Sequence, residues 1–261
     1  MRKILFLLFS FILSFLEVVA QSSDWDIVQE LILKRNYALA QSHLSDLEVD
    51  NLTTLQIEER QYNLAFCAME LYNEDAAFQL EKYLQEYPTG LFVNDVQFNL
   101  GNLFFREKNY TTAIAKYAQL NPDLLNDDER DMFYFRQGYS YFNEENFEEA
   151  KLSFQELKGV QFKFKDLTKY YVAHIAYLEG NYATALNGFE TLKEVPGIGS
   201  IVRYYIAQIY YLQGRNKELL AFALPVLDSA NIKRSAEISR LIGDAYYCLL
   251  YTSDAADDVE C

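Results

Sequence analysis

The chain has 261 residues, of which 51% are hydrophobic and 16% aromatic, and its formal net charge is -15 at pH 7. This hydrophobic content excludes a disordered chain, and the acidic balance disfavours binding to nucleic acid or to an anionic membrane, because both require clustered Lys and Arg. With 21 Tyr, 19 Phe and only two His, the composition favours repeated aromatic packing positions over a histidine-rich catalytic pocket.

The first twenty residues have the pattern of a secretory signal peptide. Residues 2–3 are basic, residues 4–16 are almost entirely apolar, and residues 18–20 supply the small side chains of a cleavage site. An uncleaved membrane anchor is the alternative, but a span needs about 18 apolar residues, and Glu17 ends this run earlier. We therefore expect cleavage after Ala20 and an exported mature chain with no integral membrane span.

A pattern that recurs at roughly 34 to 37 residues organises the rest of the chain. In each copy a small residue lies in a first apolar run, a turn follows, and a second small residue precedes a large one by four positions. Positions i, i+3 and i+4 share one face of a helix, so the spacing predicts pairs of packed helices. The clearest copies are FNLGNLFFREKNYTTAIAKY, FRQGYSYFNEENFEEAKLSF, YYVAHIAYLEGNYATALNGF and YYIAQIYYLQGRNKELLAFA, which start at residues 98, 135, 170 and 204.

These residues resemble the tetratricopeptide repeat (TPR), a helix-turn-helix unit of about 34 residues. The family's small residue on the first helix falls on Gly101, Gly138, Ala173, Ala207 and Gly243. Its second-helix alanine falls on Ala40, Ala76, Ala113, Ala150 and Ala185. The large residue that follows falls on Leu44, Leu80, Tyr117, Phe154 and Phe189. The resemblance implies an all-α fold, a right-handed α-solenoid of about six TPR-like helix hairpins plus a truncated seventh.

The resemblance places repeats near residues 21–56, 57–93, 94–130, 131–165, 166–199 and 200–235, with a partial repeat at 236–247. No domain boundary is visible between Ser22 and Tyr247, because the connectors are short and are polar or contain Gly or Pro. The repeat at 200–235 departs most from the pattern. Its second helix contains Pro225, which predicts a kinked or shortened helix.

Residues 248–261 hold two of the three cysteines and do not continue the repeat. Their first ten residues, CLLYTSDAAD, resemble the translation of the transposase-based sequencing adapter TGT CTC TTA TAC ACA TCT GAC GCT GCC GAC, without a gap. We therefore expect a non-native, adapter-derived tail and a natural protein that continues differently after Tyr247. On this expectation Cys67 is the only native cysteine, so the chain forms no internal disulfide.

In the TPR family the first helices line a concave groove that takes extended or helical peptides. The resemblance places the groove on Phe98, Asn102, Phe105, Phe135, Tyr139, Phe142, Tyr170, His174, Tyr177, Tyr204, Gln208 and Tyr211. Aromatic residues with an apolar face and a polar tip are frequent anchors for partners. The alternative is that these rings only fill the inner face against neighbouring helices, as an aromatic stripe at helical spacing commonly does.

The sequence offers no candidate for catalysis or metal binding. His43 and His174 each stand alone, and no paired cysteines or nucleophile-base pair can be assembled. A carboxylate clamp, as in some TPR domains, needs Lys and Arg beside the groove Asn, but Phe98 and Asn99 stand beside Asn102. We therefore expect no enzyme activity, no cofactor, no metal and no clamp for a chaperone tail.

These features predict an exported TPR scaffold that binds a protein or peptide in the periplasm of a Gram-negative bacterium. The chain resembles the envelope-assembly class, which includes the lipoprotein of the outer-membrane barrel-assembly machinery and the periplasmic TPR partner of the Tol-Pal system. It lacks the lipid-attachment cysteine of the former and the coiled-coil segment of the latter. The alternative function is an architectural arm of a longer protein whose functional region lies beyond residue 247.

Overall fold

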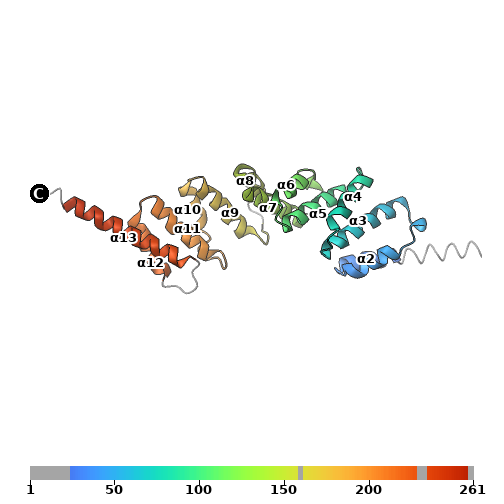
Figure 1. Cartoon of the computed structure of the whole chain (residues 1–261), viewed down its shortest axis with the longest axis horizontal. Helices are drawn as coiled ribbons and strands as arrows, with labels where there is room; N and C mark the ends of the chain where they lie inside the picture. The colour runs from blue at the N-terminus through green and yellow to red at the C-terminus, as the bar shows by residue number, and fades with distance from the viewer. Residues whose placement is uncertain (1–23, 158–160, 228–233, 258–261) are drawn as a thin grey trace, which may run out of the picture. The chain divides into compact units, whose positions relative to one another are not determined.

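The computed structural model describes residues 24–157, 161–227 and 234–257 (Figure 1). Within these ranges the regular structure is helical and contains no strand, which confirms the predicted all-α class. None of the described helices is both long and apolar enough to cross a membrane. The predicted signal peptide at residues 1–20 and the last four residues of the predicted tail lie outside the described residues.

The chain forms two compact units, one up to Asn126 and one from Asp127 onward. The sequence predicts no boundary at this point, because the connector here resembles those between the other repeats. In the N-terminal unit, helical residues 24–33 precede the named helices. These are α2 (Tyr37–Asp46), α3 (Thr54–Glu70), α4 (Ala76–Glu86), α5 (Val93–Arg106) and α6 (Tyr110–Tyr117), with 3-10 turns at Val49–Asn51 and Pro122–Leu124.

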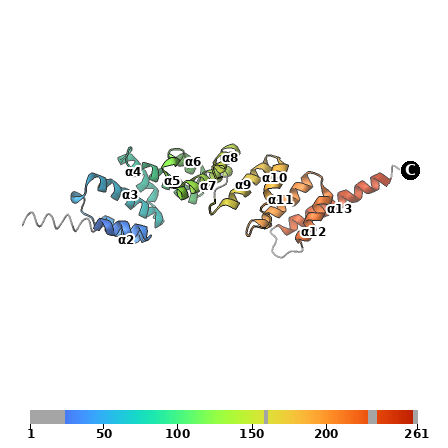
Figure 2. The same ribbon diagram turned by 180° about the vertical axis from the view of Figure 1, so that it is seen from behind.

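The C-terminal unit contains three helix hairpins and one further helix. Consecutive helices of each hairpin pack against each other, as the two opposite views show (Figure 1 and Figure 2). Its helices are α7 (Asp127–Asn143), α8 (Phe147–Gln155), α9 (Lys165–Leu178), α10 (Tyr182–Glu190), α11 (Gly199–Leu212), α12 (Asn216–Leu227) and α13 (Ser235–Asp257).

The turn inside each hairpin repeats one backbone conformation. In the hairpin of α5 and α6, Lys108 donates its backbone N–H to the carbonyl of Phe105 at 3.0 Å, and Asn109 donates to Phe104 at 2.9 Å. These two bonds make a Schellman motif, in which the residue after the helix is left-handed. Within the hairpin turns the left-handed residues have φ between 58° and 75°, and the turn recurs every 34 to 37 residues. These residues are Arg35, Tyr72, Lys108, Glu145, Gly180 and Gly214.

The small residues allow the two helices of a hairpin to approach closely. A Cβ atom added to Gly101 would overlap the ring of Tyr117, and one added to Gly138 would lie 2.7 Å from the ring of Phe154. In the hairpin of α9 and α10 the glycine is on the second helix, where a Cβ at Gly188 would lie 2.7 Å from that of Ala173. The small residue and the large residue of the pattern are therefore direct packing partners in the first two of these hairpins, and two small residues are in contact in the third.

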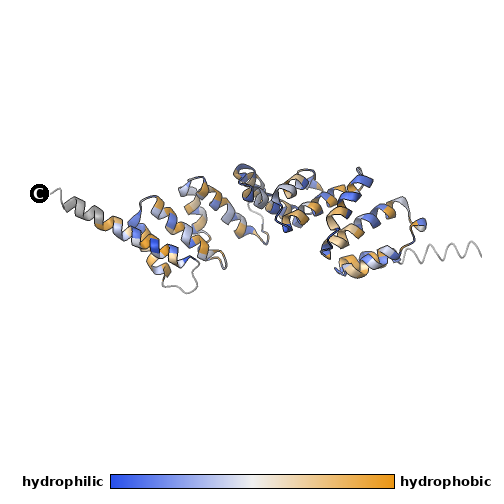
Figure 3. Ribbon diagram, viewed as in Figure 1, coloured by the Kyte–Doolittle hydropathy of each residue, from blue (hydrophilic) through white to orange (hydrophobic). Residues whose placement is uncertain are grey.

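Hydrophobic and hydrophilic residues alternate around the helices, as expected for elements that bury one stripe (Figure 3). Helix α12 is longer than α8 or α10, with 12 residues against nine in each, and it continues past Pro225. Of the two predicted effects, a kink or a shortening, the shortening does not occur. Pro225 lies near the C-terminal end, where the ring removes a single backbone hydrogen bond.

Polar contacts fix the connectors between hairpins. In the N-terminal unit, Glu58 Oε1 accepts hydrogen bonds from Tyr83 Oη and from the backbone N–H of Leu91, both at 2.6 Å, and Tyr83 Oη accepts one from Phe92 N–H at 3.1 Å. We call Glu58, Tyr83 and these two amides the connector staple. Tyr83 is fully buried, so the staple ties residues 91–92 to the core.

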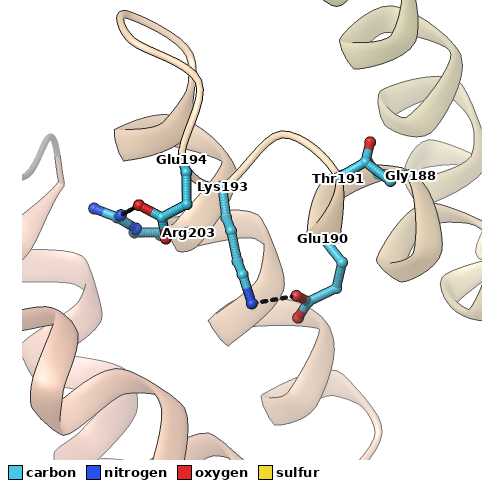
Figure 4. A network of polar contacts seen from close by, with 6 residues as sticks. All are labelled: Gly188, Glu190, Thr191, Lys193, Glu194 and Arg203. Carbon is cyan, nitrogen blue, oxygen red and sulfur yellow. Dashed lines mark hydrogen bonds and ion pairs between the residues drawn. The ribbon is translucent and has the colours of Figure 1, made fainter.

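The connector between α10 and α11 is held by ion pairs instead (Figure 4). Lys193 Nζ lies 2.7 Å from Glu190 Oε2, and Arg203 Nη2 on α11 lies 2.7 Å from Glu194 Oε2. Thr191 Oγ1 donates to the carbonyl of Gly188 at 2.8 Å at the end of α10. The charged groups are partly exposed, so each pair contributes about 1 kcal/mol or less to stability.

Candidate peptide-binding face

The twelve predicted groove residues occupy three repeated positions on α5, α7, α9 and α11. The leading position is three residues before the small residue of the first helix, the middle position is one residue after it, and the trailing position is four after it. None of the twelve side chains is fully exposed: Phe98, Phe135 and Tyr204 are buried and the others are half-buried. The three positions differ in their neighbours.

The leading position belongs to the core. Phe135 is stacked on Phe164, with ring centroids 4.7 Å apart and an interplanar angle of 13°, and Phe164 immediately precedes α9. Tyr62 of α3 takes the same position and stacks on Phe92, which precedes α5, at 4.6 Å and 5°. Burial also raises the pKa of Tyr170. These rings fill the space between one first helix and the start of the next.

The trailing position packs across its own hairpin. Its ring meets the aromatic residue that opens the second helix, with centroids 6.0 Å apart in three consecutive hairpins. The pairs are Phe105 with Tyr110, Phe142 with Phe147, and Tyr177 with Tyr182. Each trailing ring is half-buried, so it closes the hairpin and still presents part of its surface to solvent.

The middle position holds the more polar side chains. In the N-terminal unit Asn102 Oδ1 accepts a hydrogen bond from Tyr117 Oη at 2.8 Å. In the C-terminal unit Tyr139 meets Tyr171 edge to face at 5.1 Å, and Gln208 is half-buried on α11. The middle side chains of α7, α9 and α11 therefore combine apolar area with hydroxyl, imidazole and amide groups.

His174, at the middle position of α9, lies among aromatic rings. Its ring centroid is 4.8 Å from Tyr205, 5.5 Å from Phe142 and from Tyr170, and 6.1 Å from Tyr177. Its Nδ1 atom is buried and makes no hydrogen bond to any described residue. Burial lowers the pKa of His174, because an imidazolium would lose hydration without gaining an acceptor.

Two residues of this face are not among the predicted groove residues. Tyr171 and Tyr205 precede the small residue of their helices by two positions and reach the preceding first helix. Tyr171 lies 4.9 Å from Phe142, and Tyr205 lies 5.1 Å from Tyr177. In the sequence, the Tyr-Tyr doublets at residues 170–171 and 204–205 are the feature that could have indicated these two residues. The second ring of each doublet faces a different neighbour from the first.

The described residues contain no cluster of metal ligands, and the thiol of Cys67 is inaccessible. They contain no group of three or more His, Cys, Asp or Glu side chains that could hold a metal ion. Cys67 is fully buried, and burial raises the pKa of its thiol to about 11, so the nucleophilic thiolate is disfavoured. What this face can supply is non-covalent contact, through half-buried rings and amides.

The solved structures with a similar overall fold include two TPR proteins. A tetratricopeptide repeat protein from Parabacteroides merdae ATCC 43184 is 16% identical, with a TM-score of 0.52 over 92% of this chain and 90% of that one. The fold is that of TPR proteins. The C-terminal part of a TPR repeat-containing protein from Cytophaga hutchinsonii is 19% identical, with a TM-score of 0.51 over 90% of each chain. No protein-family model and no curated protein matches this chain.

Proposed function

We propose that this TPR chain is an exported scaffold that binds a protein or peptide in the bacterial envelope through the first helices of its C-terminal unit. The observation that carries the proposal is the contrast between positions on α7, α9 and α11. Leading residues such as Phe135 and Tyr204 are buried, whereas Tyr139, His174 and Gln208 are half-buried at the same register of successive helices. A ligand would therefore meet the middle and trailing positions, and not the leading one.

The chemistry of these positions suits a peptide. Rings such as Tyr139 and Tyr177 offer apolar area with few rotatable bonds, which lowers the entropy lost on binding. The Gln208 amide can both donate and accept hydrogen bonds, as a peptide backbone requires. The middle positions of α7, α9 and α11 hold no Lys or Arg, so we expect the ligand to be recognised through side chains and backbone amides and not through a terminal carboxylate.

Site-specific photocrosslinking in cells tests this binding face. A photoreactive amino acid replaces Tyr139 in one strain and Gln208 in another, and Leu152 on α8, which is 63% exposed, serves as the matched control on a second helix. We expect envelope proteins to be trapped from both first-helix positions and not from Leu152. No adduct at either position, or equal adducts at Leu152, would reject the face as the binding site.

Export has a separate test. The N-terminal residue of the protein recovered from the periplasmic fraction is expected to be Gln21, as measured by mass spectrometry. Ala20→Arg introduces a large charged side chain at the residue before the cleavage point, which signal peptidases reject. That variant should keep residues 1–20, and recovery of either protein from the cytoplasm alone would contradict export.

The alternative is that the repeats form an architectural arm of a longer protein. It is supported by the burial of the twelve predicted groove residues, each of which is buried or half-buried. Together with this alternative, which places the functional region beyond residue 247, we propose that residues 248–261 are adapter-derived. Amplification and sequencing of the locus from source DNA should replace this tail with further coding sequence, whereas the same codons in the genome would refute the proposal.

A further inference from the structure

A polar cleft lies in the N-terminal unit between the second helices α2 and α4, and its volume is about 520 Å³. Helix α3 contributes Leu64, which packs against the core beneath. The other lining residues are Ala38, Gln41, Ser42, Ser45 and Asp46 of α2 and Gln79 of α4. We call this site the α2–α4 cleft. It contains none of the twelve predicted groove residues, so it is independent of the proposed peptide-binding face.

The next pair of second helices in this unit is joined by a salt bridge. Lys116 Nζ of α6 lies 3.0 Å from Glu81 Oε1 of α4. Glu81 lies five residues after the repeat alanine of α4, and Lys116 lies three residues after that of α6. The same two positions in α2 and α4 hold Ser45 and Gln79, and both line the cleft. The cleft is therefore open at the place where a lysine and a glutamate join the next pair.

The charge of the lining favours a cationic ligand. Its one charged group is the carboxylate of Asp46, which is exposed and has no ion-pair partner among the described residues. No Lys or Arg lines the cleft. Arg60 of α3, at the same end of α2, donates to the carbonyl of Leu44 at 2.6 Å and to that of Ser45 at 3.4 Å. The lining therefore attracts a cation and offers an anion no partner.

The uncharged polar side chains of the lining supply further hydrogen-bond acceptors. Gln79 donates through Nε2 to Asp75 Oδ2 at 2.7 Å, which leaves its Oε1 atom as an acceptor. Ser45 Oγ donates to the carbonyl of Gln41 at 2.8 Å, so its lone pairs can also accept. A primary ammonium group has three donors and no acceptor, and its alkyl chain can lie on Leu64, as lysine stems lie along apolar surfaces.

We propose that the α2–α4 cleft binds a primary alkylammonium group, with the ammonium beside Asp46 and the alkyl chain on Leu64. The ligand takes the place that the Lys116 side chain occupies between α4 and α6. Two sources carry this chemistry, a lysine side chain of a partner protein and a free diamine, and the experiment below separates them.

Titration of the full chain, followed by NMR, tests the proposal with two probes, Nα-acetyl-lysine methylamide and cadaverine. The control is Nα-acetyl-norleucine methylamide, which keeps the alkyl chain of lysine and lacks the ammonium. We expect saturable shifts of the side-chain amide signals of Gln41 and Gln79 with an ammonium probe and not with the control. Tighter binding of the lysine derivative supports a partner's side chain as the source, and tighter binding of cadaverine supports a free diamine. No saturable shift with either ammonium probe, or equal shifts with the control, would overturn the proposal.

Substitutions locate the bound group. Asp46→Asn should weaken binding by about fivefold, the value of an exposed charge pair. Asp50→Asn removes an exposed carboxylate outside the cleft and should leave binding unchanged. The double variant Ser45→Glu with Gln79→Lys places the salt-bridge pair of α4 and α6 across the cleft, so it should abolish binding and melt no lower than the parent chain. Undiminished binding in Asp46→Asn, or in the folded double variant, would place the ligand elsewhere and overturn the proposal.

Discussion

The two compact units build the same hairpin but fill the space between hairpins differently. Two positions before the small residue, the N-terminal unit has Asn63 and Asn99, whereas the C-terminal unit has Tyr171 and Tyr205 on α9 and α11. Asn99 Nδ2 donates to Tyr62 Oη at 3.4 Å, and Tyr205 stacks on Phe189 at 5.4 Å. Both units thus share the hairpin, while the residue at this one position adds either an amide or a ring to the contacts between neighbouring hairpins.

Loss of a ring from the C-terminal unit should have the largest effect. Tyr205→Asn places the N-terminal type of residue among His174, Tyr177 and Phe189, and we expect a loss of about 3–5 kcal/mol in the free energy of unfolding, as for other large aromatic truncations. Asn99→Ala in the N-terminal unit should cost about 1 kcal/mol, the value of one hydrogen bond. Urea denaturation, monitored by circular dichroism, measures the free energy of unfolding of both variants. Equal losses for Tyr205→Asn and Asn99→Ala would contradict the distinction between the units.

The connector staple of the N-terminal unit should come next. Tyr83→Phe removes one of the two donors to the Glu58 carboxylate and leaves the Phe92 amide without its acceptor, so we expect a loss of about 1–3 kcal/mol in the free energy of unfolding. Tyr72→Phe is the control, because that side chain is 76% exposed and should change stability by less than about 0.5 kcal/mol. The same denaturation measurement applies, and equal values for the two variants would mean that the staple does not stabilise the unit.

The shared turns should respond alike in both units. Lys108 in the N-terminal unit and Glu145 in the C-terminal unit have φ values of 60° and 58°, which cost non-glycine residues roughly 1–2 kcal/mol. Lys108→Gly and Glu145→Gly should each stabilise the chain by about 1 kcal/mol or less, because glycine also gains freedom in the unfolded state. Gly180→Ala should destabilise it. The free energy of unfolding of each variant is measured by urea denaturation. A gain in stability for one of Lys108→Gly and Glu145→Gly and a loss for the other would show that the turns of the two units are not equivalent.

The smallest effect is the pH dependence of the aromatic cluster around His174. Burial lowers its pKa in the folded chain, so the neutral imidazole is favoured by folding. This contribution is complete above the unfolded pKa of about 6.5 and is lost as the pH falls from there through the lowered folded pKa. Stability measured between pH 8 and pH 5 should therefore decline less in His174→Gln than in the parent chain. Parallel pH profiles would contradict this prediction.

The repeat made much of the fold predictable from sequence. The spacing of Gly101, Ala113 and Tyr117 identifies the packing partners of a hairpin, because one face of a helix is fixed by its period. The candidate site was less predictable. The position of Phe135 on a first helix does not reveal that Phe164, in the next connector, stacks on it, since that contact depends on how successive hairpins pack. The role of Tyr205 was missed for the same reason.

The turn also bears on how far such sequences can diverge. Its defining hydrogen bonds join backbone atoms, as in the bonds of Lys108 and Asn109, and Arg, Tyr, Lys, Glu and Gly all occupy the left-handed position within this one chain. Few side-chain identities are thus needed to specify a hairpin, and hairpins of one molecule already differ at most positions. Drift at the remaining positions erases similarity in sequence long before it alters the backbone, which explains how chains only 16% and 19% identical to this one retain its fold.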